Sequence, residues 1–288
     1  MTKQNSPLVL GTERIGKLLT QYAIPAIIAM TASSLYNMAD SIFIGHGVGP
    51  LAISGLALTF PLMNLAAAFG SLVGVGASTL VSVKLGQKDY EGANQVLGNV
   101  LVLNVLLGVA FTIVFLLLLD PILYFFGASE NTIGYARDYM QIILYGNVIT
   151  HMYLGLNAVL RSSGFPKQAM YATLASVVIN CILNPIFIFG FEWGIKGSAW
   201  ATVISQVISL DGTDDSIFSS PKQLLHFKKG IYKLRKEVVK GILYIGMSPF
   251  FDESLFLSDC YPDQPRSERT WGRHGDWCLW YRKPHYFP

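Results

Sequence analysis

The chain contains 288 residues, of which 52% are hydrophobic and only 14% are charged. Charged residues make up about a quarter of a soluble domain, so this composition excludes an ordinary water-soluble globule. The net charge of +3 is small and the basic residues do not gather with aromatic ones in one patch, which argues against a nucleic-acid partner.

Long uncharged stretches predict membrane-spanning helices, because about twenty apolar residues at 1.5 Å each cross the roughly 30 Å hydrocarbon core. The first stretch, from Leu18 to Gly45, contains Asp40 as its only Asp, Glu, Lys or Arg. A glycine-rich break at 45–50 separates it from the second. We expect six spans, at 18–45, 52–83, 92–119, 133–160, 168–191 and from 197 onward.

The expected fold is an all-α polytopic membrane protein, with a six-helix transmembrane bundle over 1–210. The sixth helix is expected to be interrupted near 211, because only fourteen uncharged residues separate Gly197 from the carboxylates that begin at Asp211. A basic cytoplasmic linker is expected over 211–250. From 251 to 288 the chain becomes polar and aromatic, which predicts an irregular tail without a fold.

Both breaks fit an error of reading frame. With permitted codons, reading the segments that begin at 211 and 251 one base later gives apolar sequences that continue membrane helices. We therefore expect Asp211 to about Ser219, and 251–288, to be translated out of frame. The underlying nucleotide sequence tests this hypothesis.

The distribution of basic residues predicts a cytoplasmic N-terminus by the positive-inside rule. Lys and Arg precede span one, follow spans two and four, and occur seven times between 222 and 240. The loops on the opposite side hold only Lys196, with Arg137 just inside span four. The expected location is a multi-pass protein of the plasma (inner) membrane.

Asp40 is the first candidate functional residue. An ionisable group in hydrocarbon costs roughly 2.5 to 3.5 kcal/mol on insertion scales, so it usually faces a cavity and has a role. The alternative is a carboxylate near the end of a span that reaches interfacial water. We favour the functional interpretation, in which protonation of Asp40 biases the bundle between two conformations.

Other polar residues in the spans have two interpretations each. His151 could carry protons, but a single histidine beside Tyr153 and Asn147 is more often a packing residue. Asn180 and Asn184 lie on one helix face, where they could bond to the carboxylate or join helices structurally.

Catalytic and metal sites are not expected. No span presents clustered His, Asp and Glu or a Ser/His/Asp arrangement, which disfavours a membrane enzyme. The three cysteines, Cys181, Cys260 and Cys278, have neither metal-ligand spacing nor an even number for a disulfide framework.

Five segments together resemble the multidrug and toxic compound extrusion (MATE) transporters. They lie at 36–45, 84–91, 160–164, 184–190 and 194–206 and read YNMADSIFIG, KLGQKDYE, LRSSG, NPIFIFG and GIKGSAWATVISQ. Their order and spacing over residues 10–210 carry the resemblance. Residues 222–250 resemble the cytoplasmic linker of that family and the start of its seventh span.

The resemblance implies one half of a twelve-helix antiporter, in which two six-helix bundles surround a central cavity. Such proteins export drugs and organic cations in exchange for H⁺ or Na⁺ and need no other cofactor. Asp40 matches the acid of span one that helps to form the cation site, and Tyr36 matches its hydrogen-bonding neighbour. Asn180 and Thr202 match polar partners on spans five and six. Asn184 stands where many relatives have a second acid, which weighs against a relay of two carboxylates.

The expected partners are the lipid bilayer, small-molecule drugs or organic cations, and a missing C-terminal half. Alternating access needs two repeats that move against each other around a shared site, so we expect an inactive half-transporter. Two alternatives are a non-transporting membrane fragment and a lipid-linked saccharide flippase of the same wider fold. Flippase cavities usually carry several basic residues, whereas spans one and two contain no Lys or Arg.

Overall fold

The computed structural model describes residues 14–213, 225–226 and 230–259. Helices account for the regular structure in these ranges, which confirms the predicted all-α fold. In chain order they are α1 (Ile15–Gly47), α2 (Pro50–Gly86), α3 (Tyr90–Leu117), α4 (Leu119–Phe125), α5 (Ile133–Tyr145), α6 (Asn147–Ser162), α7 (Pro166–Pro185), the π-helix η3 (Ile186–Gly190), α8 (Ile195–Thr213) and α9 (Lys236–Asp259).

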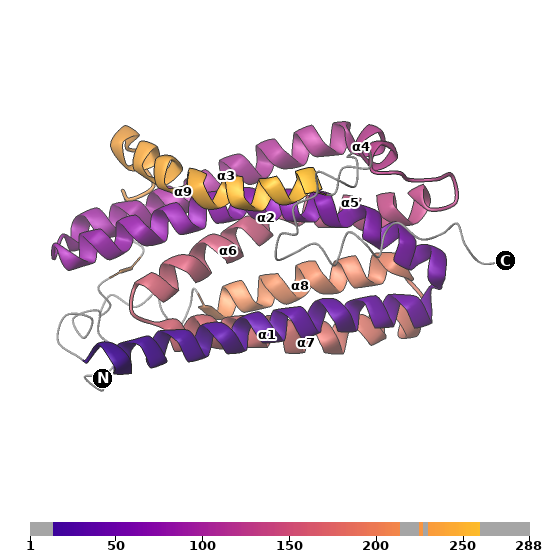
Figure 1. Ribbon diagram of the computed structural model, residues 1–288, viewed down its shortest axis with the longest axis horizontal. Helices are drawn as coiled ribbons and strands as arrows, with labels where there is room; N and C mark the ends of the chain where they lie inside the picture. The colour runs from indigo at the N-terminus through magenta and orange to yellow at the C-terminus, as the bar shows by residue number, and fades with distance from the viewer. Residues whose placement is uncertain (1–13, 214–224, 227–229, 260–288) are drawn as a thin grey trace.

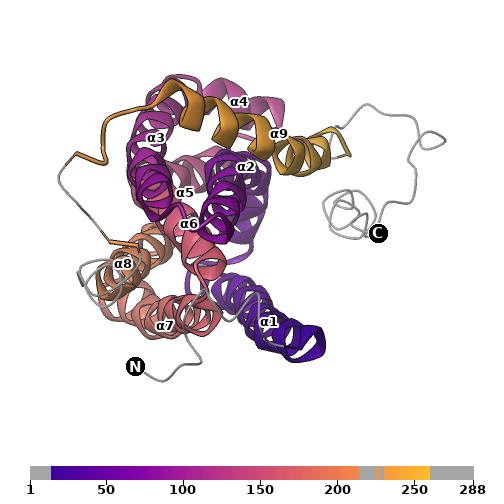
Figure 2. The same cartoon turned by 90° about the vertical axis from the view of Figure 1, so that its left-hand side faces the viewer.

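The helices form an elongated bundle with two sides (Figure 1). Seen along the bundle, α1, α7 and α8 group together, while α2, α3 and α9 lie on the other side of α6 (Figure 2). The packing agrees with this view: α1 lies against α7 and α7 against α8, whereas α2 contacts α3, α6 and α9. Helices far apart in sequence, such as α1 and α8, are therefore brought to the same side.

The described helices support a multi-pass membrane protein, although the count of six spans is approximate. Within the described ranges, α1, α2, α3 and α7 with η3 are long and apolar enough to cross a membrane. The bent pair α5 and α6 makes a fifth if it is one span. α8 is not among them, and its uncharged run ends at Asp211.

The predicted span at 133–160 is two helices rather than one. α5 and α6 meet at Gly146 with a bend of 56°. The side chain of Val203 on α8 occupies the space in which a Cβ at Gly146 would lie. Glycine is a poor helix former, which favours a break at this position. Because Gly146 has no side chain, it also leaves room for Val203 of α8.

Pro185 ends α7, and the chain continues as the π-helix η3. Proline lacks the N–H that a continuing α-helix needs, and wide π turns often accompany such interruptions at functional sites. Asn184 is the residue before this proline, so its side chain lies at the end of α7, close to the π-helix.

α8 ends at Thr213, near the interruption expected at 211. α9 runs to Asp259, past the expected start of an irregular tail at 251. The segment 251–259 contains no glycine or proline, so nothing in its backbone stops the helix. The rest of the expected tail, from 260, and the expected out-of-frame segment beyond Thr213 lie outside the described residues. The reading-frame hypothesis stays a prediction.

The apolar core consists of two clusters, one toward each end of the bundle. One is formed by the first half of α2 with α4, α5 and the start of α8. The other joins the second half of α2 with the first half of α3, the second half of α6, and α9. Both clusters share α2, which makes that helix the axis of its side of the bundle.

α9 lies against α2 through glycines on both helices. A Cβ at Gly76 would collide with the carbonyl of Ile242, and one at Gly246 with the carbonyl of Leu72. The segment before α9 is held by α3: Asn99 Oδ1 accepts a hydrogen bond from the Arg235 backbone N–H at 2.9 Å. Close backbone approach of this kind drives helix association in lipid, where the hydrophobic effect is absent.

Candidate functional site

The carboxylate of Asp40 lies inside the bundle. Most of α1 is exposed, and its buried residues are Pro25, Asp40 and Ile44. Asp40 is 5% exposed, so its side chain does not extend into bulk solvent. The sequence interpretation in which Asp40 reaches water at the end of a span therefore finds no support in this geometry.

Two neutral donors from other helices hold the carboxylate. Asp40 Oδ1 accepts a hydrogen bond from Asn184 Nδ2 of α7 at 2.8 Å and another from the Ser198 hydroxyl of α8. No Lys or Arg of the described chain forms an ion pair with it. A charge buried without a counter-ion is costly, so this carboxylate is suited to bind a cation.

The hydrogen bonds continue from the carboxylate into a closed chain across three helices. Asn184 Nδ2 also donates to Asn180 Oδ1 at 2.9 Å, and Asn180 Nδ2 donates to Thr202 Oγ1 at 3.2 Å. The Tyr36 hydroxyl lies 2.8 Å from Thr202 Oγ1 and returns the chain to α1. We call these six residues the Asp40 network: Tyr36, Asp40, Asn180, Asn184, Ser198 and Thr202.

The sequence builds this network from three pairs, each one helical turn apart. Residues 36 and 40, 180 and 184, and 198 and 202 have the four-residue spacing that places side chains on one helix face. Gly197 lets α8 approach, since a Cβ there would lie 2.9 Å from the Phe187 carbonyl carbon. The small residue thus brings Ser198 within reach of Asp40.

The oxygen atoms of the network fit a small hard cation. Asn184 Oδ1 is buried and has no hydrogen-bond partner among the described residues. Carboxylate, amide and hydroxyl oxygens are the ligands that such cations prefer. No group of three or more His, Cys, Asp and Glu that could hold a metal occurs in the ranges that the structure describes.

All five residues that the sequence singled out lie together in the Asp40 network, although their role stays a prediction. Sequence reasoning missed two neighbours, Ser198 and Tyr139. Ser198 could have been found from its position four residues before Thr202. Tyr139 of α5 is 1% exposed and lies near Asp40 and Tyr36, but α5 shows no polar pattern that points to it.

His151 belongs to a separate polar group between α2, α3 and α6. Its Nε2 lies 2.9 Å from the Ala66 carbonyl, and Asn147 Nδ2 donates to the Gly108 carbonyl at 3.4 Å. Neither Asn104 amide atom has a partner among the described residues, and the same holds for His151 Nδ1. We call Asn104, Asn147 and His151 the His151 group. No hydrogen bond of the described residues joins it to the Asp40 network.

Comparison with known proteins places this arrangement in a family. The family model MatE matches residues 25–186, more than half of the chain. The multidrug export protein MepA of Staphylococcus haemolyticus is 32% identical over 237 residues, which cover 82% of this chain and 52% of MepA. MepA of Staphylococcus aureus strain NCTC 8325 is 32% identical over 243 residues, with 81% and 52% covered. The chain thus spans about half the length of these relatives.

Solved structures agree. An outward-facing multidrug resistance MATE family transporter of the MOP superfamily matches with a TM-score of 0.82 and 28% identity, over 90% of this chain and 57% of that one. An inward-facing structure matches with a TM-score of 0.74 over 81% and 55%. Members of this family are transporters and not enzymes. The chain belongs to the MatE family of MATE transporters.

Proposed function

We propose that the chain forms the N-terminal bundle of a cation-coupled exporter of drugs and organic cations, in which Asp40 binds the coupling H⁺ or Na⁺. One observation carries the proposal: a buried carboxylate bonded only to neutral donors from two other helices. The relatives named multidrug export proteins support the substrate class. The proposed location is the plasma membrane with a cytoplasmic N-terminus, which rests on the distribution of basic residues.

Binding of a cation at Asp40 changes the charge that three helices share. Asn184 and Ser198 both donate to the same carboxylate oxygen, and a bound proton or Na⁺ competes with these donors. Because the donors sit on α7 and α8, loss of either bond alters how α1 lies against both helices. A ligand that binds one arrangement better than another shifts the population toward it.

The surroundings of the carboxylate suit such a shift. The buried residues of α1 are few, and the helix packs mainly against α7, so its movement would change one main helix contact. On α7, the regular helix ends at Pro185, directly after the residue that donates to Asp40. Non-α backbone at membrane depth is tolerated where it is buried in protein or lines a cavity.

Export requires a second bundle in this proposal. Alternating access moves two repeats against each other around a shared site, and the chain covers 52% of MepA from S. haemolyticus. We therefore expect cells that produce the 288 residues alone to retain a cationic dye. Efflux from those cells would contradict the inactive half-transporter.

The test of export uses a version extended with a second bundle, encoded by the gene read in the corrected frame. We expect dye efflux from this version and none after Asp40→Asn. Asp89→Asn is the matched control, because Asp89 is also a carboxylate but lies in the turn between α2 and α3. Undiminished efflux with Asp40→Asn would refute the role of Asp40, and imposed H⁺ or Na⁺ gradients distinguish the coupling ion.

A further inference from the structure

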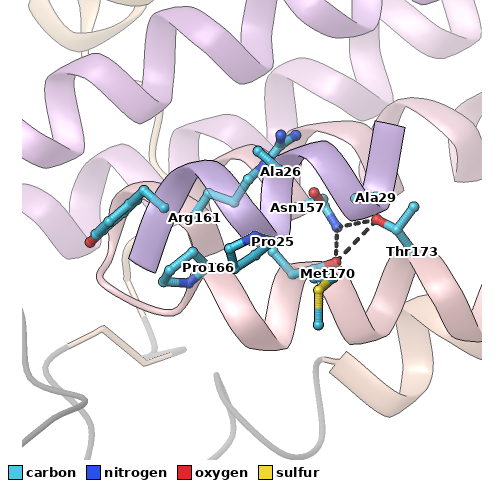
Figure 3. A pocket seen from close by; sticks show the side chains of 10 residues that line it. Pro25, Ala26, Ala29, Asn157, Arg161, Pro166, Met170 and Thr173 are labelled. Atoms are coloured by element: carbon cyan, nitrogen blue, oxygen red, sulfur yellow. Dashed lines mark hydrogen bonds between the residues drawn. The ribbon is translucent and has the colours of Figure 1, made fainter. Parts of the chain in front are cut away.

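A cavity of about 210 Å³ lies between α1, α6 and α7, away from the Asp40 network. Figure 3 shows side chains of all three helices around it. On α1 the lining runs from Tyr22 to Ala29, and on α7 from Pro166 to Thr173. At 1.5 Å per residue, each of these stretches spans about 10 Å. The stretch on α7 starts at the first residue of that helix, Pro166, so we expect the cavity to lie near the interfacial layer of a membrane.

The cavity is amphipathic. Its walls are largely apolar, and the residues that supply them are Pro25, Ala26, Ala29, Pro166, Ala169 and Met170. The polar wall is formed by Tyr22, Asn157, Thr173 and Arg161. Asn157 Nδ2 is already used, since it donates to the Ala169 carbonyl at 3.1 Å and to Thr173 Oγ1 at 3.4 Å (Figure 3). The Arg161 guanidinium and the Tyr22 hydroxyl remain as donors that a ligand would meet, and Arg161 is the charged one.

Arg161 has no counter-ion among the described residues. By contrast, Arg137 pairs with Asp120 at 2.7 Å, and Lys196 pairs with Asp138 at 3.3 Å. Arg161 lines a cavity that contains no carboxylate. Guanidinium groups bind phosphate and carboxylate oxygens through paired N–H donors, so the cavity is prepared for an anion.

We propose that this cavity binds the phosphate headgroup of an anionic phospholipid, with Arg161 on the phosphate and the apolar walls beside the glycerol and acyl chain. The amphipathic lining favours a lipid over free phosphate, which has no apolar part to bury. Basic pockets between transmembrane helices are a recognised setting for anionic headgroups. The ligand would hold the first half of α1 against α6 and α7, whereas Asp40 lies in the second half of α1.

The test measures lipid retained by the purified 288-residue chain, using native mass spectrometry after incubation with phosphatidylglycerol or phosphatidylcholine. We expect preferential retention of phosphatidylglycerol. Arg161→Gln should reduce its affinity about fivefold, which corresponds to about 1 kcal/mol for one basic group at a membrane surface. Lys167→Gln is the matched control, because Lys167 is an exposed base near the start of α7 that does not line the cavity.

A second variant tests the cavity independently of Arg161, in case Arg161→Gln does not fold. Ala26→Leu keeps Arg161 and fills the cavity, so it should also lower retention of phosphatidylglycerol while the thermal unfolding midpoint stays close to that of the parent. Equal retention of the two lipids by the parent chain, or unchanged retention in both variants, would overturn the proposal. Displacement of phosphatidylglycerol by equimolar inorganic phosphate would overturn the lipid assignment in favour of a free anion.

Discussion

The Asp40 network and the His151 group are both buried among helices, but their hydrogen bonds are made differently. In the Asp40 network, side chains bond to side chains from α1 to α7 to α8 and back to α1. In the His151 group, the hydrogen bonds run from side chains to the backbone carbonyls of Ala66 and Gly108. A change at one member of the first group therefore alters the bonds of side chains on two other helices, whereas a change in the second breaks a bond to a backbone carbonyl.

This difference indicates which buried polar residues are suited to couple cation binding to helix movement. The backbone carbonyls of a helix are held in place by the hydrogen bonds of that helix. A side chain bonded to such a carbonyl therefore has a fixed partner and a structural role. Side chains bonded to one another can exchange partners when one of them changes charge. We expect mutations in the Asp40 network to alter cation binding, and mutations in the His151 group to alter stability.

The largest expected effect is that of Asp40→Asn on cation binding by the purified chain. Removing the carboxylate charge should weaken binding roughly a hundredfold, as expected for loss of a charge-assisted contact worth about 3 kcal/mol. Sodium binding is measured with radioactive Na⁺, and proton binding with an indicator dye in weakly buffered solution. His151→Gln should leave both unchanged. If His151→Gln abolished binding and Asp40→Asn did not, the comparison would be reversed.

The next effect separates the two groups by the sign of a stability change. Asn180→Leu removes one link of the Asp40 network and leaves Asn184 and Thr202 short of a partner, so it should lower the free energy of unfolding by about 1 to 2 kcal/mol. Asn104→Leu removes two buried polar atoms that have no partner among the described residues. It should raise the free energy of unfolding by a similar amount, measured by thermal unfolding in detergent.

The two leucine variants control for each other, because each replaces a buried asparagine by an apolar residue of similar size in the middle of a helix. Asn104 is 0% exposed and Asn180 is 1% exposed. A loss of stability with Asn104→Leu would mean that its amide has a partner, such as an internal water, and that the His151 group is better satisfied than its protein contacts indicate.

Much of this arrangement was predictable, because a membrane-spanning helix needs about twenty apolar residues and seldom contains a charged one. Uncharged length alone placed α1, α2 and α3, and the single carboxylate marked the site. Residues at four-residue spacing on the same helix could be paired from the sequence. The bend at Gly146 was not predicted, because the contact of that glycine with Val203 of α8 is visible only in the folded structure.

Ser198 was missed although it shares a helix face with Thr202, four residues later. It lies in a stretch of small residues that is typical of helix packing, and the approach of α8 to α1 reveals its contact with Asp40. The reach of α9 to Asp259 was missed for a different reason. A polar composition predicted a tail, but composition does not stop a helix that has neither glycine nor proline to end it.

A smaller effect is expected for Tyr36→Phe, which removes the link from Thr202 back to α1. Thr202 Oγ1 still accepts from Asn180 Nδ2, so the loss of stability should be about 0.6 kcal/mol, the average for an interhelical hydrogen bond in a membrane protein. Thermal unfolding of the purified variant measures it. Cation binding should fall only slightly, since Asp40 keeps both of its donors. A loss as large as that of Asp40→Asn would make Tyr36 a direct ligand.

The smallest expected effect is that of Asp89→Asn on the pH dependence of stability, which compares the buried Asp40 with a carboxylate outside the bundle. Asp89 caps α3 by accepting from the Gly92 N–H at 2.9 Å, and Lys84 Nζ lies 2.8 Å from its other oxygen. The bond from Lys84, followed by that from Gly92, lowers the pKa of Asp89 below its usual value of 3.8. The charged form is therefore favoured in the folded state.

This depressed pKa fixes the direction of a pH effect. The stabilisation by Asp89 is fully present above the pKa of 3.8 that the unfolded chain has, and it is lost as the pH falls through the lower folded pKa. Asn also caps helices, so Asp89→Asn should keep α3 intact and flatten the fall in unfolding temperature below about pH 4. The side chains of Lys84 and Asp89 are 37% and 41% exposed, so added salt should weaken the effect at Asp89. A variant whose unfolding temperature falls with acid as steeply as that of the parent would show that other carboxylates govern this range.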